Sequence, residues 1–382
     1  MKKFLAMTLG VAMLSTAALA GCDWFGPKED TRTMLTAPTC TIYDNYIRWS
    51  PIENAVGYVV SVNGVEQAMQ ENCDYTVNTD EEVSVKVKAI AEESSKDYKN
   101  SEYGSSVVRQ ADPKYEDALT DEDLQALANT HDEGSDMYMI DLPATSEAYS
   151  LSFSESTAIY AILVPEEVRL IHVVTDEEGA TVNFVLETRA TPFILELAGA
   201  ALTARDDNSV INASASAVAS GMNIIVRSLT EENAGAPTNS LTGGNSTKVG
   251  SKGKGGNFVS GGGKGGTGGA GLDAIVAENV LFCGNASVVL TGGKGATGGA
   301  GGDNSANLGG DGGNGGKGGS AVSGKAYINI PNRLVSLLGG AGGAGGAKGK
   351  STNLFASPSA GKAGATGGSA ADIIVFNGEV KK

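Results

Sequence analysis

The stretch AIVAENVLFCGNASVVLTGG at residues 274–293 is followed, after a glycine-rich interval, by AVSGKAYINIPNRLVSLLGG at residues 321–340. Aligning Ala274 with Ala321 needs no gap, and the offset is 321 − 274 = 47 residues. The alignment places Ile275 over Val322, Asn285 over Asn332, Val288 over Val335 and Leu290 over Leu337. A repeat of this length predicts units that stack, each burying its apolar residues against the next.

The repeat continues toward the C-terminus, where Gly318–Ala321 returns as Gly367–Ala370 at an offset of 49. Each unit joins an apolar stretch to a longer glycine-rich stretch. We therefore expect the apolar part to form one coil of a β-solenoid and the glycine-rich part to be an insertion on one side of it.

The glycine-rich insertions have a period of three. Residues 292–303 read GGK, GAT, GGA, GGD; residues 309–320 read GGD, GGN, GGK, GGS; residues 339–347 read GGA three times. Residues 233–382 hold 44 of the 54 glycines and three prolines, and so few prolines exclude collagen. The period favours extended legs of the polyglycine-II type, which rise ~3.1 Å per residue, turn at 304–308 and 351–360, and hydrogen-bond to one another. They resemble the Gly-Gly-X bundles of some phage adhesins and receptor ectodomains. A disordered, linker-like state is the competing interpretation.

Short runs rich in Val and Ile occur from about Ser150 onward, without helical periodicity or hairpin signals, and they also favour parallel coils. They are Val168–Val174, Val182–Leu186, Phe193–Leu197, Ser209–Ile211 and Asn223–Val226. In pattern, Asp207–Ile211 and Gly221–Val226 resemble coils of pectate-lyase-like, right-handed parallel β-helices.

The N-terminus resembles that of bacterial lipoproteins. Lys2 and Lys3 precede an apolar stretch that ends in Leu19-Ala20-Gly21-Cys22, which is similar to a lipobox. The resemblance implies that residues 1–21 are removed, that Cys22 is lipidated, and that acyl chains hold the protein on a membrane. The alternative is cleavage near Ala20 to give a soluble secreted protein.

Residues 37–111 alternate short strands with turn residues, which is typical of a β-sandwich. Trp49 before Ser50-Pro51, the Gly57-Tyr58 pair and the alternating run Val83–Ala89 resemble a bacterial fibronectin type III module. Trp49 is then a core residue, and the resemblance implies a spacer that positions other parts of the chain.

The predicted fold class is all-β: a fibronectin type III-like sandwich followed by a parallel β-solenoid with polyglycine-II-like insertions. A short helix is expected at about residues 121–129, because Thr120 is a suitable N-cap before acidic residues and Asp123 lies three positions after it. The predicted segments are 1–21 (signal peptide), 22–35 (lipidated tether), 36–111 (sandwich), 112–145 (connector with helix), 146–232 (coils) and 233–382 (coils with glycine-rich repeats).

Charge divides the chain. The formal net charge is −16, yet residues 233–382 carry 13 Lys+Arg against 6 Asp+Glu, a net charge of +7. A nucleic-acid partner is not expected for an acidic protein. The lysines among the glycines are interpreted either as a contact for an anionic polymer or surface, or as residues that keep this region soluble. After lipidation, Cys40, Cys73 and Cys283 remain, and a Cys40–Cys73 disulfide and two free thiols are both compatible with the spacing.

No catalytic, metal-binding or cofactor-binding residues are assigned, and the ligand-binding residues stay unidentified. His131 and His172 lie in different predicted elements, so a His-based triad or metal site is not expected, and His172 is expected at a surface or strand edge. Ala344–Ser351 fits a relaxed phosphate-loop pattern without the helix that such a loop needs, and Gly298–Asp303 starts like a calcium-binding nonapeptide without repeating the Asp. Asp206-Asp207 is the one candidate carboxylate pair, although adjacent residues also suit a turn.

These features predict a non-catalytic surface lipoprotein of the bacterial cell envelope. It is expected to be extracytoplasmic, anchored in the lipid bilayer through Cys22, and to act in binding, adhesion or structural display. The expected partner is a polysaccharide or a host or envelope surface. The alternative is a β-helix polysaccharide lyase or hydrolase that uses carboxylates.

Overall fold

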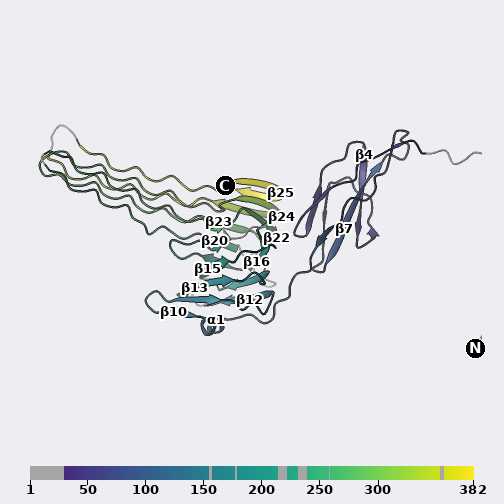
Figure 1. Cartoon of the computed structure of the whole chain (residues 1–382), viewed down its shortest axis with the longest axis horizontal. Coiled ribbons are helices and arrows are strands. Elements are labelled where there is room, and N and C mark those ends of the chain that lie inside the picture. The colour runs from purple at the N-terminus through teal and green to yellow at the C-terminus, as the bar shows by residue number, and fades with distance from the viewer. Residues whose placement is uncertain are drawn as a thin grey trace, which may run out of the picture.

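The computed structural model describes residues 30–154, 157–176, 179–213, 222–230, 239–257, 259–352 and 357–382. These residues are mostly β-structure, as the sequence predicts, with one α-helix among them. They form two bodies with separate main cores: a two-sheet body at residues 33–109 and a coiled body at residues 119–381 (Figure 1). The predicted signal peptide and Cys22 lie outside the described residues.

The two-sheet body pairs its strands antiparallel, except for the parallel pair β1–β8. Its strands are β1 (Thr33–Met34), β2 (Cys40–Tyr43), β3 (Tyr46–Trp49), β4 (Ala55–Val62), β5 (Val65–Glu66), β6 (Asp74–Thr76), β7 (Val83–Ala91), β8 (Tyr98–Lys99) and β9 (Val107–Arg109). One sheet has the order β2-β3-β6 and the other β5-β4-β7-β9. Alternate residues of β7 are buried, as the period-two pattern predicts, and Trp49 is a core residue whose ring meets Tyr58 edge-on.

The coiled body winds its chain so that strands of successive turns pair in parallel. Its strands are β10 (Thr130–Asp132), β11 (Met137–Asp141), β12 (Ala148–Phe153), β13 (Ile159–Val164), β14 (Leu170–Thr175), β15 (Ala180–Leu186), β16 (Phe193–Ala198), β17 (Ala201–Thr203), β18 (Ile211–Asn212), β19 (Ile224–Leu229), β20 (Asn239–Thr242), β21 (Ile275–Val276), β22 (Asn279–Gly284), β23 (Val288–Thr291), β24 (Lys325–Leu338) and β25 (Asp372–Lys381). The first stack is β12-β14-β16-β19-β22-β24, and the second is β11-β13-β15-β17-β20-β23-β24. The long strand β24 belongs to both stacks and pairs with β25.

The 47-residue repeat stacks as predicted. Ile275 bridges Val322, Val288 pairs with Val335, and Leu290 pairs with Leu337. The predicted offset of 49 for the next unit is wrong, because Lys325 pairs with Asp372 at 372 − 325 = 47. The register then shifts along these strands, because Asn329 pairs with Asn377 at an offset of 48 and Val335 with Val380 at an offset of 45.

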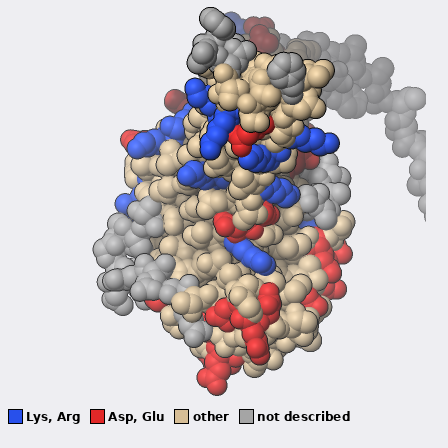
Figure 2. Space-filling view, turned by 90° about the vertical axis from the view of Figure 1, so that its left-hand side faces the viewer, with Lys and Arg blue, Asp and Glu red and all other residues tan. Residues whose placement is uncertain are grey.

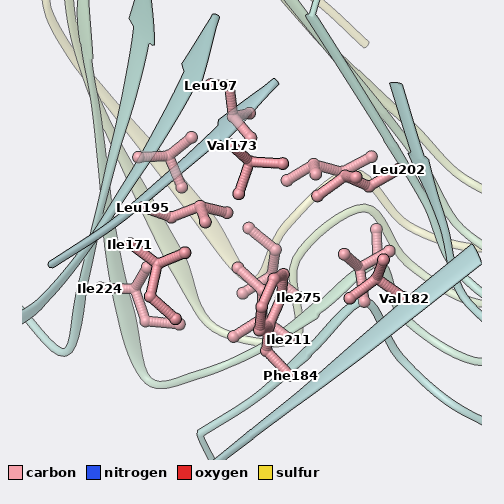
Figure 3. Close-up of a cluster of buried hydrophobic side chains, with 14 of the residues drawn as sticks. Ile171, Val173, Val182, Phe184, Leu195, Leu197, Leu202, Ile211, Ile224 and Ile275 are labelled. Carbon is pink, nitrogen blue, oxygen red and sulfur yellow. The ribbon is translucent and has the colours of Figure 1, made fainter. Parts of the chain in front are cut away.

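The core of the coiled body lies between the stacks. Figure 3 shows Ile171, Val173 and Leu195 of the first stack facing Val182, Phe184 and Leu202 of the second, with Ile211 and Ile275 closing the third side. Ladders of aliphatic residues, one from each turn, fill this space, as expected for a stack in which each turn buries the next.

Helix α1 (Asp121–Leu127) covers the N-terminal end of this core. Its capping box is formed by Thr120 and Asp123, as predicted, and Leu124 is fully buried in the core of the coiled body. The helix ends two residues before the predicted boundary because Ala128 is already extended and β10 begins at Thr130.

Candidate functional site

The glycine-rich insertions form six extended legs that project from the coiled body, away from the two-sheet body (Figure 1). We number them in chain order: leg 1 (243–257), leg 2 (260–272), leg 3 (292–303), leg 4 (309–320), leg 5 (339–350) and leg 6 (359–368). The odd legs run outward and the even legs return. In the preceding turn, the short turn Ala204–Ser209 occupies the corresponding place, because Thr203 pairs with Thr242 and Ile211 with Ile275.

Backbone hydrogen bonds with a period of three join the legs. In leg 3, one set of N–H groups donates to leg 5 and the next set donates to leg 2, while the third position of each triplet faces solvent. In the first set, the N–H groups of Gly295, Gly298 and Gly301 donate to the carbonyl oxygens of Ala341, Ala344 and Ala347, each at 2.9 Å. The second set includes the N–H of Gly299, which donates to the carbonyl oxygen of Gly266 at 2.8 Å. The described parts of the insertions are therefore hydrogen-bonded legs, as predicted; residue 258 and residues 353–356 lie outside the described part.

Glycine is required where two legs touch. A Cβ at Gly313 would overlap the carbonyl oxygen of Gly266, and a Cβ at Gly346 would overlap that of Gly299. Along legs 3 and 4 the first two residues of each triplet are buried. Ala296 is the one residue with a side chain at these positions in legs 3 and 4; at the glycines that fill the others, a Cβ would push the legs apart and break the hydrogen bonds between them.

The outermost legs carry side chains at positions that hold glycine in most inner triplets. In leg 6, Ala360, Ala363 and Thr366 correspond to Gly312, Gly315 and Gly318 of leg 4. The register follows from hydrogen bonds: Gly313 donates to Gly299 of leg 3, and Gly361 donates in the same way to Gly346 of leg 5. In leg 1, the corresponding outward positions hold Lys248, Ser251 and Lys254. The bundle therefore ends sterically at both edges, because these Cβ atoms would collide with a further leg.

Asp and Asn at the solvent-facing positions accept hydrogen bonds from the next turn. The Oδ1 atoms of Asp303, Asp311 and Asn314 accept from the N–H groups of Lys350 (2.8 Å), Ser359 (2.6 Å) and Lys362 (3.0 Å). The bond from the Lys350 N–H, followed by that from the Lys252 side chain, holds the pKa of Asp303 below its usual range. The Asp of the nonapeptide-like motif is thus a structural acceptor.

The legs carry nine lysines and two aspartates, a net charge of +7. The lysines are Lys248, Lys252, Lys254, Lys264, Lys294, Lys317, Lys348, Lys350 and Lys362, and all nine are exposed. Among the residues that the structure describes, Lys252 alone of the nine forms an ion pair, with Asp303 at 3.2 Å. Figure 2 shows basic residues gathered over the legs and acidic residues over the lower part of the same face.

A second polar site lies where the two-sheet body meets the outer face of the first stack. The Arg227 guanidinium contacts Asp44 of the two-sheet body (2.7 Å), Asp112 of the connector (2.9 Å) and Glu196 of β16 (3.0 Å). All four side chains are buried or nearly so, and a cleft of about 670 Å³ lies beside them. One guanidinium thus joins three carboxylates from three segments of the chain.

Arg227, Asp44, Asp112 and Glu196 form what we call the joint between the two bodies, and their charges stabilise one another. Burial raises the pKa of Asp112, but bonds to Arg227 and then Arg109 outweigh it and leave the net pKa below its ordinary value. Burial likewise opposes ionisation of Glu196, and His172 and Arg227 overcome it, so its pKa is also lowered. The pKa of Arg227 is raised, since the carboxylates, with Asp44 first, outweigh its burial.

Apolar contacts surround the ionic part of the joint. The ring of Phe376 on β25 lies 4.7 Å from that of Tyr43 and 5.4 Å from that of Tyr46, and Arg48 lies over it at 4.7 Å. Tyr43 also packs against an outer cluster of the first stack that includes Leu281 and Cys283. The two bodies are therefore held by both apolar packing and paired charges.

The structure places the remaining sequence candidates apart from one another. Asp206-Asp207 lies in the turn below leg 1, where the Asp207 carboxylate accepts from the N–H and hydroxyl of Thr247 and so anchors that leg. His131 is exposed, beside Asp136 at 3.0 Å. The expectation of an edge position for His172 is wrong: β14 lies between β12 and β16, and His172 stacks on Tyr115 next to Glu196.

Residues 344–350 of the phosphate-loop-like segment form the outer half of leg 5, and the segment leads into no helix within the described residues. Cys40, Cys73 and Cys283 are free thiols. Arg227 was not among the residues that the sequence singled out. Its one signal in the sequence is a charge directly after the apolar run Ile224–Val226.

Among the described residues, no group of three or more His, Cys, Asp or Glu side chains is arranged to hold a metal ion. In the same part of the chain, no helix has the length and apolar character needed to cross a membrane. Comparisons with protein-family models, with curated proteins and with solved structures give no match.

Proposed function

We propose that this protein is a lipid-anchored surface protein of the bacterial envelope that displays the glycine legs as a non-catalytic binding or adhesion element. The two-sheet body would serve as a fibronectin type III-like spacer. The coiled body would be a parallel β-helix that carries the legs as polyglycine-II-like extensions.

The strand pairing supports these fold assignments. Three- and four-stranded antiparallel sheets around Trp49 suit a fibronectin type III-like sandwich, and two stacks of parallel strands joined turn by turn suit a β-helix. The period of three in the hydrogen bonds between legs suits the polyglycine-II-like conformation.

The observation that carries the functional proposal is the projecting, hydrogen-bonded bundle with its exposed lysines. A 12-residue leg at ~3.1 Å per residue extends roughly 37 Å, and the joint at Arg227 ties the spacer to the body that holds the bundle. Such an arrangement presents a stiff, basic surface away from the spacer. The Asp207 carboxylate accepts a hydrogen bond from the Thr247 N–H. This contact favours a structural role over catalysis for the Asp206-Asp207 pair.

The test replaces the legs by the short turn of the same chain. In this variant each leg pair is exchanged for the turn Ala204–Ser209, which already connects equivalent strands in the preceding turn. We expect the circular dichroism spectrum to stay that of a folded β-protein, while beads coated with the variant lose retention on bacterial and host-cell surfaces. Equal retention of the full chain and the legless chain would refute the display role.

The anchor is tested separately. Metabolic labelling with palmitate is expected to mark the full chain and not the Cys22→Ser variant, and only the full chain should fractionate with membranes. Unlabelled full chain released into the medium would overturn the anchor and leave the leg experiment unaffected.

A further inference from the structure

The C-terminal edge of the leg bundle exposes backbone donors without partners. In leg 3, the N–H groups of Gly292, Gly295 and Gly298 donate to Leu338, Ala341 and Ala344 of the next turn. The same positions one repeat later are Gly339, Gly342 and Gly345 of leg 5, and no leg lies beyond them among the residues that the structure describes. Within the described residues, these three N–H groups have no hydrogen-bond partner.

Leg 6 repeats the pattern. In leg 4, Gly312, Gly315 and Gly318 donate to Ser359, Lys362 and Ala365 of leg 6. The equivalent N–H groups in leg 6 belong to Ala360, Ala363 and Thr366; these residues are exposed, and the described part of the chain gives their N–H groups no partner. The edge thus presents two rows of N–H donors. Within each row, successive donors are three residues apart, which is about 9 Å along the leg.

Another leg, from this chain or from a second copy, does not fit this edge. The Cβ atoms of Ala360, Ala363 and Thr366 occupy the space that a neighbouring leg needs, as a Cβ at Gly312 would overlap the carbonyl oxygen of Gly346. Two such edges would also face donor against donor. The occupant must therefore supply acceptors and leave room for methyl groups.

Positive charge surrounds the donor rows. Lys348 and Lys350 lie on leg 5 and Lys362 on leg 6, all exposed and, within the described residues, without an ion-pair partner. The nearby carboxylate of Asp303 accepts from the Lys350 N–H, and that of Asp311 from Ser359. Exposed N–H groups in rows, with ammonium groups beside them, can donate hydrogen bonds to carboxylates and other oxyanions.

We propose that the edge formed by legs 5 and 6, which we call the donor edge, binds a linear acidic polysaccharide whose carboxylates recur along the chain. The oxygens of the polymer accept from the N–H rows, and its carboxylates lie beside Lys348, Lys350 and Lys362. A polymer is favoured over a small anion because the donors form a repeating row with no single pocket. The inference rests on the proposed function and identifies the chemical class of its ligand.

The experiment measures binding of alginate, neutral dextran and phosphatidylglycerol vesicles to the full chain carrying Cys22→Ser, so that no acyl anchor reaches the vesicles. The first variant, K348Q/K350Q/K362Q, removes three charges at the donor edge. The matched control, K248Q/K254Q/K264Q, removes three charges from legs 1 and 2 at the opposite edge. We expect alginate binding, no dextran binding, and a loss of affinity of about tenfold or more for the donor-edge variant alone.

A second pair of variants tests the N–H groups themselves. Proline suits the extended conformation of the legs and removes an N–H, so Ala360→Pro with Ala363→Pro should weaken alginate binding without loss of the folded spectrum. Ala363→Ser keeps the N–H and should bind as the parent does.

Three outcomes would overturn the donor edge. Equal losses in the two lysine variants would show binding by diffuse charge, unchanged binding in the proline variant would exclude the N–H rows, and binding to vesicles without alginate binding would identify a lipid surface instead. Failure of the proposed function is distinguishable, because it appears as undiminished cell-surface retention of the legless chain.

Discussion

The guanidinium of Arg227 and the carboxylate of Asp44 form a bidentate pair across the two bodies, with Nε–Oδ2 at 3.0 Å and Nη2–Oδ1 at 2.7 Å. Asp44 lies in the turn between β2 and β3, where its φ of 55° directs the backbone through a tight reversal. Arg227 lies in the middle of β19, within the first stack. Two residues far apart in the sequence therefore fix how the two-sheet body sits on the coiled body.

Replacing Arg227 with Met is expected to destabilise the protein strongly. It leaves the carboxylates of Asp44, Asp112 and Glu196 buried without their cation, and breaking a buried pair in this way costs about 3–5 kcal/mol. Urea unfolding with fluorescence detection measures the effect, and small-angle scattering should show a larger radius of gyration as the bodies separate. The control is Lys88→Gln, which removes the more exposed pair with Glu66 and should cost less than about 1 kcal/mol.

The joint is expected to weaken in acid. The folded-state pKa values of Asp112 and Glu196 are lowered, so their ionised forms stabilise the folded joint above their ordinary pKa of about 4, and this contribution is lost as the pH falls through the lowered values. Scattering curves recorded from pH 7 down to pH 3 should show the bodies separating near the acid end. A joint that stays compact throughout would contradict this account, as would an identical acid transition in Arg227→Met.

Much of the coiled body was predictable because stacking imposes register on the sequence. Val288 and Val335 occupy the same place in successive turns, so they match at the offset that the strand pairing later shows. The glycine triplets were readable for a similar reason: in legs that touch on two sides, glycine fills the first two positions of nearly every triplet and the side chain stands at the third.

The joint and the donor edge were not predictable in the same way. Arg227, Asp44 and Asp112 share no periodicity, and their meeting depends on how two separately folded bodies dock. The donor edge depends on the side chains of Ala360 and Ala363, which leave no room for a further leg, yet both residues read in the sequence as ordinary members of the repeat. A sequence pattern specifies neighbours within a repeat better than it specifies where the repeat stops.

A single methyl group inside the bundle is expected to disrupt it. In Gly313→Ala the new Cβ meets the carbonyl oxygen of Gly266, and such overpacking costs about 1–3 kcal/mol. Hydrogen exchange should accelerate at the amides of legs 2 and 4, while the strands of the coiled body keep their protection. The matched control is Thr297→Ala at a solvent-facing position, which should leave exchange unchanged; similar exchange in both variants would mean that the legs do not pack as described.

Cys40 and Cys73 are expected to stay reduced even under oxidising conditions. Cys40 pairs with Trp49 on one side and Cys73 hydrogen-bonds to Trp49 on the other, so the two cysteines lie two strands apart, roughly 9–10 Å. A disulfide needs Cα atoms within about 7 Å, and no such approach is possible while Trp49 lies between them. Burial also raises the pKa of Cys40 to about 11, which keeps it protonated and slow to react at neutral pH.

Intact mass under non-reducing conditions should therefore correspond to free thiols, with alkylation slow in the native protein and fast in denaturant. A mass lower by two hydrogens that is restored by reductant would show that the sheet order β2-β3-β6 is wrong.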